Sequence, residues 1–304
     1  MGIDKPMNGK DCDQMRKKEY RPRVSDVLGI ALIMASLIYF FVAGVSSDLG
    51  MTAMEIFFKL LLKLPVFLLP ILFVNFTYRR FGMTLPTIPR SLGHNESTML
   101  TVSTFGAIVL MQMLYGSVFP SMMKPVGVAE TDSVSGVVLL YLSAVVIPAV
   151  LREIFFRGVV LRALTAHRIL LAILISSVSD ALMRFSLEAF PIVFFCGFLI
   201  GSLYFTTGSL SSVVGVHLAG STVWFLGEII GVYFPTRYAI FMRIFIASSV
   251  LLLAFGLPFL KKTVRAILAD EHDDLVLPVS AFWGAPIIVF LILAIAVQLI
   301  FGSI

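Results

Sequence analysis

The sequence predicts an all-α, polytopic membrane helix bundle with about eight to nine transmembrane helices. Three observations support this fold class. Of the 304 residues, 59% are apolar and 13% are charged, whereas a soluble domain carries about 25% charged residues. Nine segments hold the roughly 20 mostly apolar residues that a helix needs to cross a bilayer, and basic residues recur in alternate connections between them. The mean hydropathy of +0.99 agrees, because a bilayer removes the need to bury apolar surface.

The nine predicted helices differ in how regular their apolar patterns are. The second is the least regular, because Glu55, Lys59 and Lys63 recur on one face. Its first turns therefore either span the membrane or lie at the interface with the lysines reaching the headgroups. Pro65 and Pro70 predict a kink in its deeper part. The predicted helices are 26–46, 54–76, 99–119, 134–152, 168–187, 189–206, 210–232, 239–260 and 284–303.

The placement of basic residues predicts how the chain is oriented. Positive residues gather on the cytoplasmic side of membrane proteins, and here they fall on one side of a nine-helix bundle. We therefore expect a multi-pass protein of the plasma membrane with a cytoplasmic N-terminus, an external C-terminus and no cleavable signal. The basic positions are Arg16, Lys17, Lys18, Arg21, Arg23, Arg79, Arg80, Arg90, Arg157, Arg162, Arg168, Lys261, Lys262 and Arg265.

Ionisable residues inside the predicted helices form three groups, and such residues in a membrane indicate a functional site. Arg152, Glu153 and Arg157 lie where the fourth predicted helix reaches the cytoplasmic interface. Asp180 and Arg184 are one turn apart on the fifth. The seventh carries a third group on one face, made of His217, Ser221 and Glu228.

Neither a metal nor a cofactor is expected from this composition. The two cysteines, Cys12 and Cys196, are not expected to form a disulfide, because one lies in the polar tail and the other inside a predicted helix. One histidine and one available carboxylate fall short of the three protein ligands that a catalytic zinc needs. We also expect no nucleic-acid partner.

The runs "IPAVLREIFFRGVVLRAL", "ISSVSDALMRF" and "FFCGFLIGSLYFTTGSLSSVVGVHLAGSTVWFL" resemble the CPBP family of CAAX-processing and bacteriocin-processing intramembrane proteases. The resemblance implies a core at 134–232. The charge and hydropathy patterns predict that a basic cytoplasmic tail at 1–25 and transmembrane helices at 26–133 precede this core. Further transmembrane helices follow at 233–304. The resemblance also implies a peptide or membrane-protein partner within the lipid bilayer, and it leaves the oligomeric state open.

The family pattern implies catalytic roles that this chain retains only in part. The family's first glutamate and its second-motif histidine are thought to activate water, and its third-motif histidine and asparagine to hold an oxyanion. Here Arg152 and Arg184 stand at the water-activating positions, and Asp180 stands at the second-motif phenylalanine. The retained residues are Glu153, Arg157 and His217, whereas Ser221 replaces the asparagine.

These substitutions predict a site that has lost its general base. Arginine has no acceptor atom and stays protonated in proteins, so neither Arg152 nor Arg184 can activate water. We expect Arg152 to pair with Asp180, and Arg184 to pair with Glu153 or Glu228, because buried charges are tolerated when paired. The alternative is that these side chains extend to the membrane interface.

Three functions remain open from the sequence. The first is a pseudoprotease that binds and regulates a membrane or cell-envelope protein. The second is an active CAAX-type endopeptidase that uses Glu153 and His217. The third is a transporter, although the sequence shows no internal repeat of the kind that many transporters carry.

The pairs Gly197/Gly201 and Gly227/Gly231 have the spacing that lets membrane helices approach closely. We expect both pairs to pack against neighbouring helices of the same chain; a dimer seam is the alternative.

Overall fold

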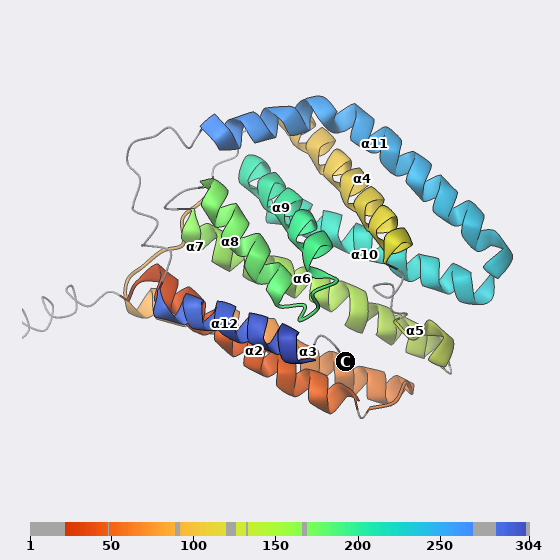
Figure 1. The fold of residues 1–304 in the computed structure, drawn as a ribbon, viewed down its shortest axis with the longest axis horizontal. Helices are drawn as coiled ribbons and strands as arrows, with labels where there is room; N and C mark the ends of the chain where they lie inside the picture. The colour runs from red at the N-terminus through yellow and green to blue at the C-terminus, as the bar shows by residue number, and fades with distance from the viewer. Residues whose placement is uncertain are drawn as a thin grey trace, which may run out of the picture.

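A computed structural model describes residues 22–47, 49–88, 92–119, 126–131, 133–165, 169–269 and 284–301. These residues form helices and connections and contain no strand, which confirms the predicted all-α class. Figure 1 shows a bundle of helices. They are α2 (Val24–Ser47), α3 (Ala53–Arg80), α4 (His94–Val118), α5 (Val134–Tyr141), α6 (Ile147–Glu153), α7 (Arg162–Leu164), α8 (Ile169–Leu182), α9 (Phe190–Thr207), α10 (Leu210–Tyr233), α11 (Pro235–Ala269) and α12 (Ala285–Phe301).

The chain is a multi-pass membrane protein. Within the described residues, 7 helices are long and apolar enough to cross a membrane, and α8 and α12 are shorter apolar helices. Each of the nine predicted segments corresponds to one of these. Three predicted C-terminal ends were wrong by five residues or more, because the fourth helix runs on to Leu164, the fifth ends at Leu182 and the eighth runs on to Ala269.

The fourth predicted helix is one continuous helical rod, Val134–Leu164, made up of α5, α6, α7 and two π-helical stretches between them. These stretches, Leu142–Val146 and Ile154–Leu161, join α5 to α6 and α6 to α7. A π-helical turn takes in an extra residue and is frequent at functional sites. Both π-helical stretches therefore flank the segment that carries Arg152 and Glu153.

The helices are arranged around this rod. Helices α2, α3 and α12 pack together on one side, and α4, α10 and α11 pack on the other (Figure 1). Helices α8 and α9 form a hairpin between the two groups. The rod contacts α3, α8, α9 and α10, so its charged residues face several helices at once.

The basic connections gather at one end of the bundle. Lys262 Nζ near the end of α11 pairs with Glu96 Oε1 at the start of α4 at 2.8 Å. Arg162 Nε donates to the carbonyl of Pro86 in the second connection at 2.9 Å. The prediction was wrong for Arg157, which lies inside the rod and is fully buried. The basic residues of the tail up to Arg21, Arg90 and Arg168 lie outside the described residues.

The "TGSL" turn joins α9 to α10 by two local devices. Gly208 ends α9 with a φ of 62°, a left-handed conformation that favours glycine. Ser209 then begins α10, because its hydroxyl accepts a hydrogen bond from the backbone N–H of Ser212 at 3.2 Å. This turn fixes the start of the helix that carries His217.

Helix α3 is continuous from Ala53 to Arg80 through both prolines. Its first turn carries a capping box between Thr52 and Glu55. Lys63 turns inward and donates from Nζ to the carbonyl oxygen of Ser143 at 3.3 Å and to its hydroxyl at 3.2 Å. The alternative of an interfacial entry with headgroup-reaching lysines is therefore wrong for Lys63.

The carbonyl that Lys63 contacts has a physical reason to need a donor. In this π-helical stretch the N–H of Ile147 donates to the carbonyl of Leu142, a five-residue offset. The same offset assigns the Ser143 carbonyl to residue 148, which is a proline without an N–H. The ammonium group of Lys63 supplies the missing donor.

We predict that Lys63→Met lowers the free energy of unfolding by about 1–3 kcal/mol, because it leaves a buried carbonyl without a donor. Thermal denaturation in detergent measures this loss. Lys59→Met is the matched control, since the Nζ of Lys59 donates to no carbonyl among the described residues and contacts the Met51 sulfur at 3.6 Å. Equal stability of the two variants would contradict the assignment.

Both small-residue pairs pack within the chain, as predicted. A Cβ added at Gly197 would meet Arg157 Nη2 at 3.0 Å, and one added at Gly201 would meet Ile173 at 3.1 Å. At Gly227 and Gly231 the nearest atoms would belong to aromatic side chains of α11. Each pair thus lets one neighbouring element of the bundle approach its helix closely.

Candidate functional site

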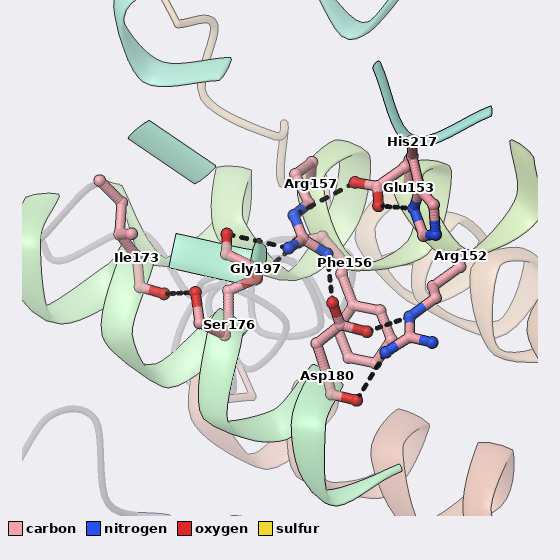
Figure 2. Close-up of polar contacts among 10 residues, drawn as sticks. Arg152, Glu153, Phe156, Arg157, Ile173, Ser176, Asp180, Gly197 and His217 are labelled. Atoms are coloured by element: carbon pink, nitrogen blue, oxygen red, sulfur yellow. Dashed lines mark hydrogen bonds and ion pairs between the residues drawn. The ribbon is translucent and has the colours of Figure 1, made fainter. Parts of the chain in front are cut away.

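Arg157 is the centre of the charged cluster. It lies in the π-helical stretch and its side chain is fully buried. Its Nη1 donates to Asp180 Oδ2 at 2.7 Å, and its Nη2 donates to the Gly197 carbonyl at 3.0 Å. Its Nε lies 3.2 Å from Glu153 Oε2. Figure 2 shows the guanidinium between the two carboxylates, so one arginine bridges the rod, α8 and α9.

Arg152 is paired with Asp180, as the sequence predicts. The Nε of Arg152 donates to Asp180 Oδ1, and its Nη2 donates to the Asp180 backbone carbonyl at 2.9 Å. Both side chains are buried. The alternative, in which these side chains extend to the membrane interface, is therefore wrong for this pair.

Glu153 is held between Arg157 and His217. Its side chain is fully buried, and its Oε1 is hydrogen-bonded to His217 Nδ1. An ionised carboxylate can only accept a hydrogen bond, so the Nδ1 of His217 donates. The consequence is that His217 Nε2 is the ring nitrogen left for other partners.

The prediction that Arg184 pairs with Glu153 or Glu228 was wrong. Glu228 accepts hydrogen bonds from three consecutive backbone N–H groups, those of Val126, Gly127 and Val128, at 2.7–2.9 Å. Glu153 is occupied by Arg157 and His217. Arg184 lies in the turn after α8, is exposed, and makes no ion pair with a carboxylate of the described residues.

The cluster also lies deeper in the bundle than the sequence indicates. The rod continues beyond Glu153 to Leu164, which places the cluster about 15 Å from the end of the rod at 1.5 Å per residue. The predicted position at the interface was wrong, because the predicted helix ended at residue 152.

A cavity of about 800 Å³ adjoins the cluster. Most of the predicted site residues line it: Arg152, Glu153, Asp180, Arg184, His217, Ser221 and Glu228. Arg157 is buried behind them and is not part of the wall. The structure therefore brings all three predicted groups to one place, although they come from three separate segments of the chain.

The cavity extends from the middle of the bundle to one end. Its inner walls include Ile108 of α4 and Ile200 of α9, which lie far from the ends of their helices. Its rim includes Ser117, Val232 and Tyr238, which are exposed and lie at the ends of α4, α10 and α11 opposite to the basic connections.

Sequence reasoning did not identify several residues of this site. Trp224 lines the cavity and donates from Nε1 to Gln112 Oε1 at 2.7 Å. Cys196 also lines it. A polar glutamine inside an apolar helix was the one available signal for Gln112.

The donor set of the site does not suit a metal. Among the described residues there is no group of three or more histidine, cysteine or acidic side chains that could hold a metal ion. The carboxylates of Glu153 and Asp180 are bound by arginines instead.

The family comparison covers this part of the chain. The family model described as type II CAAX prenyl endopeptidase Rce1-like matches residues 134–223. Over these residues the chain is similar to the CAAX-type proteases. Its Rce1-like segment begins with the rod and ends on α10, so it contains the whole charged cluster except Glu228. Neither the curated proteins nor the solved structures searched gave a match to this chain.

Proposed function

We propose that this CAAX-protease-type membrane protein is a pseudoprotease, which binds a ligand in the inherited cavity and regulates a membrane or cell-envelope protein without hydrolysing it. The observation that carries the proposal is the arginine at each water-activating position of the family pattern. Arg152 and Arg184 both line the cavity, and neither can accept a proton from water.

The pairing of Arg152 supports the same proposal. A general base must reach water or substrate with an unoccupied acceptor. The carboxylate oxygens of Asp180 are occupied, because they accept hydrogen bonds from Arg152 and Arg157. Asp180 therefore cannot take over the role of the base. Glu153 is fully buried with its two oxygens facing Arg157 and His217.

The proposal includes an orientation and a membrane. The basic connections gather at one end, and the preference of basic loops for the cytoplasm places that end inside the cell. The N-terminus is then cytoplasmic, and the membrane is the plasma membrane.

An active endopeptidase is the second candidate, and the hydrogen bond between Glu153 and His217 favours it. A carboxylate that orients an imidazole through Nδ1 is the arrangement found in many hydrolases. In that case Nε2 of His217 would accept the proton of the attacking water, with Glu153 as the positioning residue.

A cleavage assay distinguishes the two functions. We expect that the purified protein leaves prenylated peptides with a C-terminal CAAX sequence intact, at the level of its Glu153→Gln and His217→Ala variants. An active type II CAAX prenyl endopeptidase serves as the positive control for the same peptides. Cleavage by the unaltered protein that is lost in both variants would reject the pseudoprotease proposal.

A further inference from the structure

The charged cluster beside the cavity, counting Arg157 behind the wall, holds more arginines than carboxylates. Three arginines, Arg152, Arg157 and Arg184, stand against the two carboxylates of Glu153 and Asp180. The other acidic residue of the lining, Glu228, accepts hydrogen bonds from three backbone N–H groups, which occupy both of its carboxylate oxygens. Among the described residues, His217, which is bound to Glu153, and Cys196 of the lining also face the cluster.

Two of the arginines keep donors available to the cavity. Arg152 uses Nε and Nη2 for Asp180, which leaves the N–H groups of Nη1. Arg184 is exposed within the lining and is unpaired with any carboxylate of the described chain. Arg152 and Arg184 both line this cavity. Two like charges held near each other in a low-dielectric site favour a bound anion.

The rest of the cavity wall is apolar. Outside the cluster the lining is dominated by aliphatic and aromatic side chains, such as Ile108, Val193, Ile200 and Phe225. A volume of about 800 Å³ lies within the roughly 300–1,000 Å³ of small-molecule sites. The cavity thus combines one cationic patch with a long apolar wall that reaches an exposed rim.

We propose that the cavity binds a single-chain anionic amphiphile, with its carboxylate or phosphate head on Arg152 and Arg184 and its apolar chain along the walls toward the rim. Arginine forks bind both head groups by charge-assisted hydrogen bonds. The inference rests on the proposed function, since the ligand stays bound in the inherited cleft. It takes its specificity from the two arginines that replaced the family's catalytic groups.

Fluorescence quenching tests this binding directly. Trp224 lines the cavity, and a Trp283→Phe background leaves it as the single tryptophan of the chain. We expect dibromostearate and a brominated lysophosphatidic acid to quench Trp224 with saturation. The brominated alcohol of the same chain length, which lacks the charge, should bind about 10-fold more weakly or worse. Equal quenching by acid and alcohol would overturn the proposal.

Variants assign the head group to its arginine. Arg184→Gln should weaken dibromostearate binding about 10- to 100-fold, and Arg184→Lys should recover part of the loss. The matched control is Arg243→Gln, which removes an exposed arginine of α11 that does not line the cavity. An Arg184→Gln variant that binds as tightly as the control would overturn the assignment.

Further ligands separate the sources of the anion and the two proposals. Saturable competition by acetate or inorganic phosphate alone would show a free-anion site and reject the amphiphile. An apolar peptide acid that competes while fatty acids do not would reject it as well. These lipid probes contain no peptide bond, so their binding does not depend on hydrolysis. Loss of lipid binding and detection of peptide cleavage are therefore separate outcomes.

Discussion

Asp180→Leu is expected to lower the free energy of unfolding by about 3–5 kcal/mol, the cost of breaking a buried ion pair by removing one partner. Asp180 accepts from both Arg152 and Arg157, and all three side chains are buried. Its removal leaves three arginines of the cluster with Glu153 as their one carboxylate. Unfolding in a detergent–SDS titration measures the loss.

Adding Arg152→Met to Asp180→Leu should restore most of that stability. The double variant keeps the ion pair between Arg157 and Glu153 and removes the charge that lost its partner. Replacing a buried ion pair by apolar residues of similar volume is often neutral or stabilising. We therefore expect a coupling energy of about 1–3 kcal/mol between the two substitutions.

The single variant Arg152→Met completes the cycle. It leaves Asp180 paired with Arg157, so we expect a smaller loss than for Asp180→Leu. Additive effects of the two substitutions would contradict the pairing, whatever the size of the single losses. Far-ultraviolet circular dichroism on each variant checks that the helices remain formed.

Gly256→Ala is expected to cost about 1–3 kcal/mol or more, the penalty of overpacking a close interface. Gly256 of α11 faces α4, and a Cβ at this position would lie 1.8 Å from the Cβ of Ser103. Both atoms are fixed by their helix backbones, so neither can rotate away. The helices must separate instead, and both of them line the cavity.

A compensating substitution tests the contact. Ser103→Gly removes the opposing Cβ, after which the nearest remaining atom is the Ser103 Cα at 3.2 Å from the added group. We expect Ser103→Gly/Gly256→Ala to be more stable than Gly256→Ala in thermal denaturation. Gly44→Ala is the control, because a Cβ at Gly44 would meet no atom within 4 Å. Equal stability of the single and double variants would contradict this packing.

The fold class could be predicted because transmembrane helices have a strong local signal. Apolar runs of spanning length and the alternation of basic connections both follow from the bilayer itself. The end of the fourth helix could not be predicted in the same way. Arg152, Glu153 and Arg157 resemble the polar end of a helix, whereas the structure buries them through contacts with α8, α9 and α10.

The site was predictable where a substitution had an obvious complement. Arg152 stands where the family pattern has a glutamate, and Asp180 stands where it has a phenylalanine. Their pairing could be predicted because the two new charges are opposite and belong to one cleft. The partners of Arg184 did not follow. Glu228 was an available carboxylate by sequence, but it accepts three backbone N–H groups of the segment at 126–128. A pattern of side chains in the sequence does not indicate which backbone N–H groups will donate to a carboxylate.

Lys63 illustrates a further limit of sequence reasoning. A lysine in an apolar helix usually extends its ammonium group to the headgroups. Here the Ser143 carbonyl lacks a backbone donor, because Pro148 has no N–H group, and the ammonium group of Lys63 turns inward to donate to this carbonyl. Lys63 and Pro148 lie 85 positions apart in the chain. The packing of α3 against the rod brings them together.

The position of the cavity rim sets the route by which an occupant arrives. The rim at Ser117, Val232 and Tyr238 lies at the end of the bundle opposite to Lys262 and Glu96. In the proposed orientation, with the basic end in the cytoplasm, the opening would face the outer leaflet. A molecule supplied from the cell exterior or from that leaflet would then enter without crossing the bilayer, and one made in the cytosol would first have to be exported.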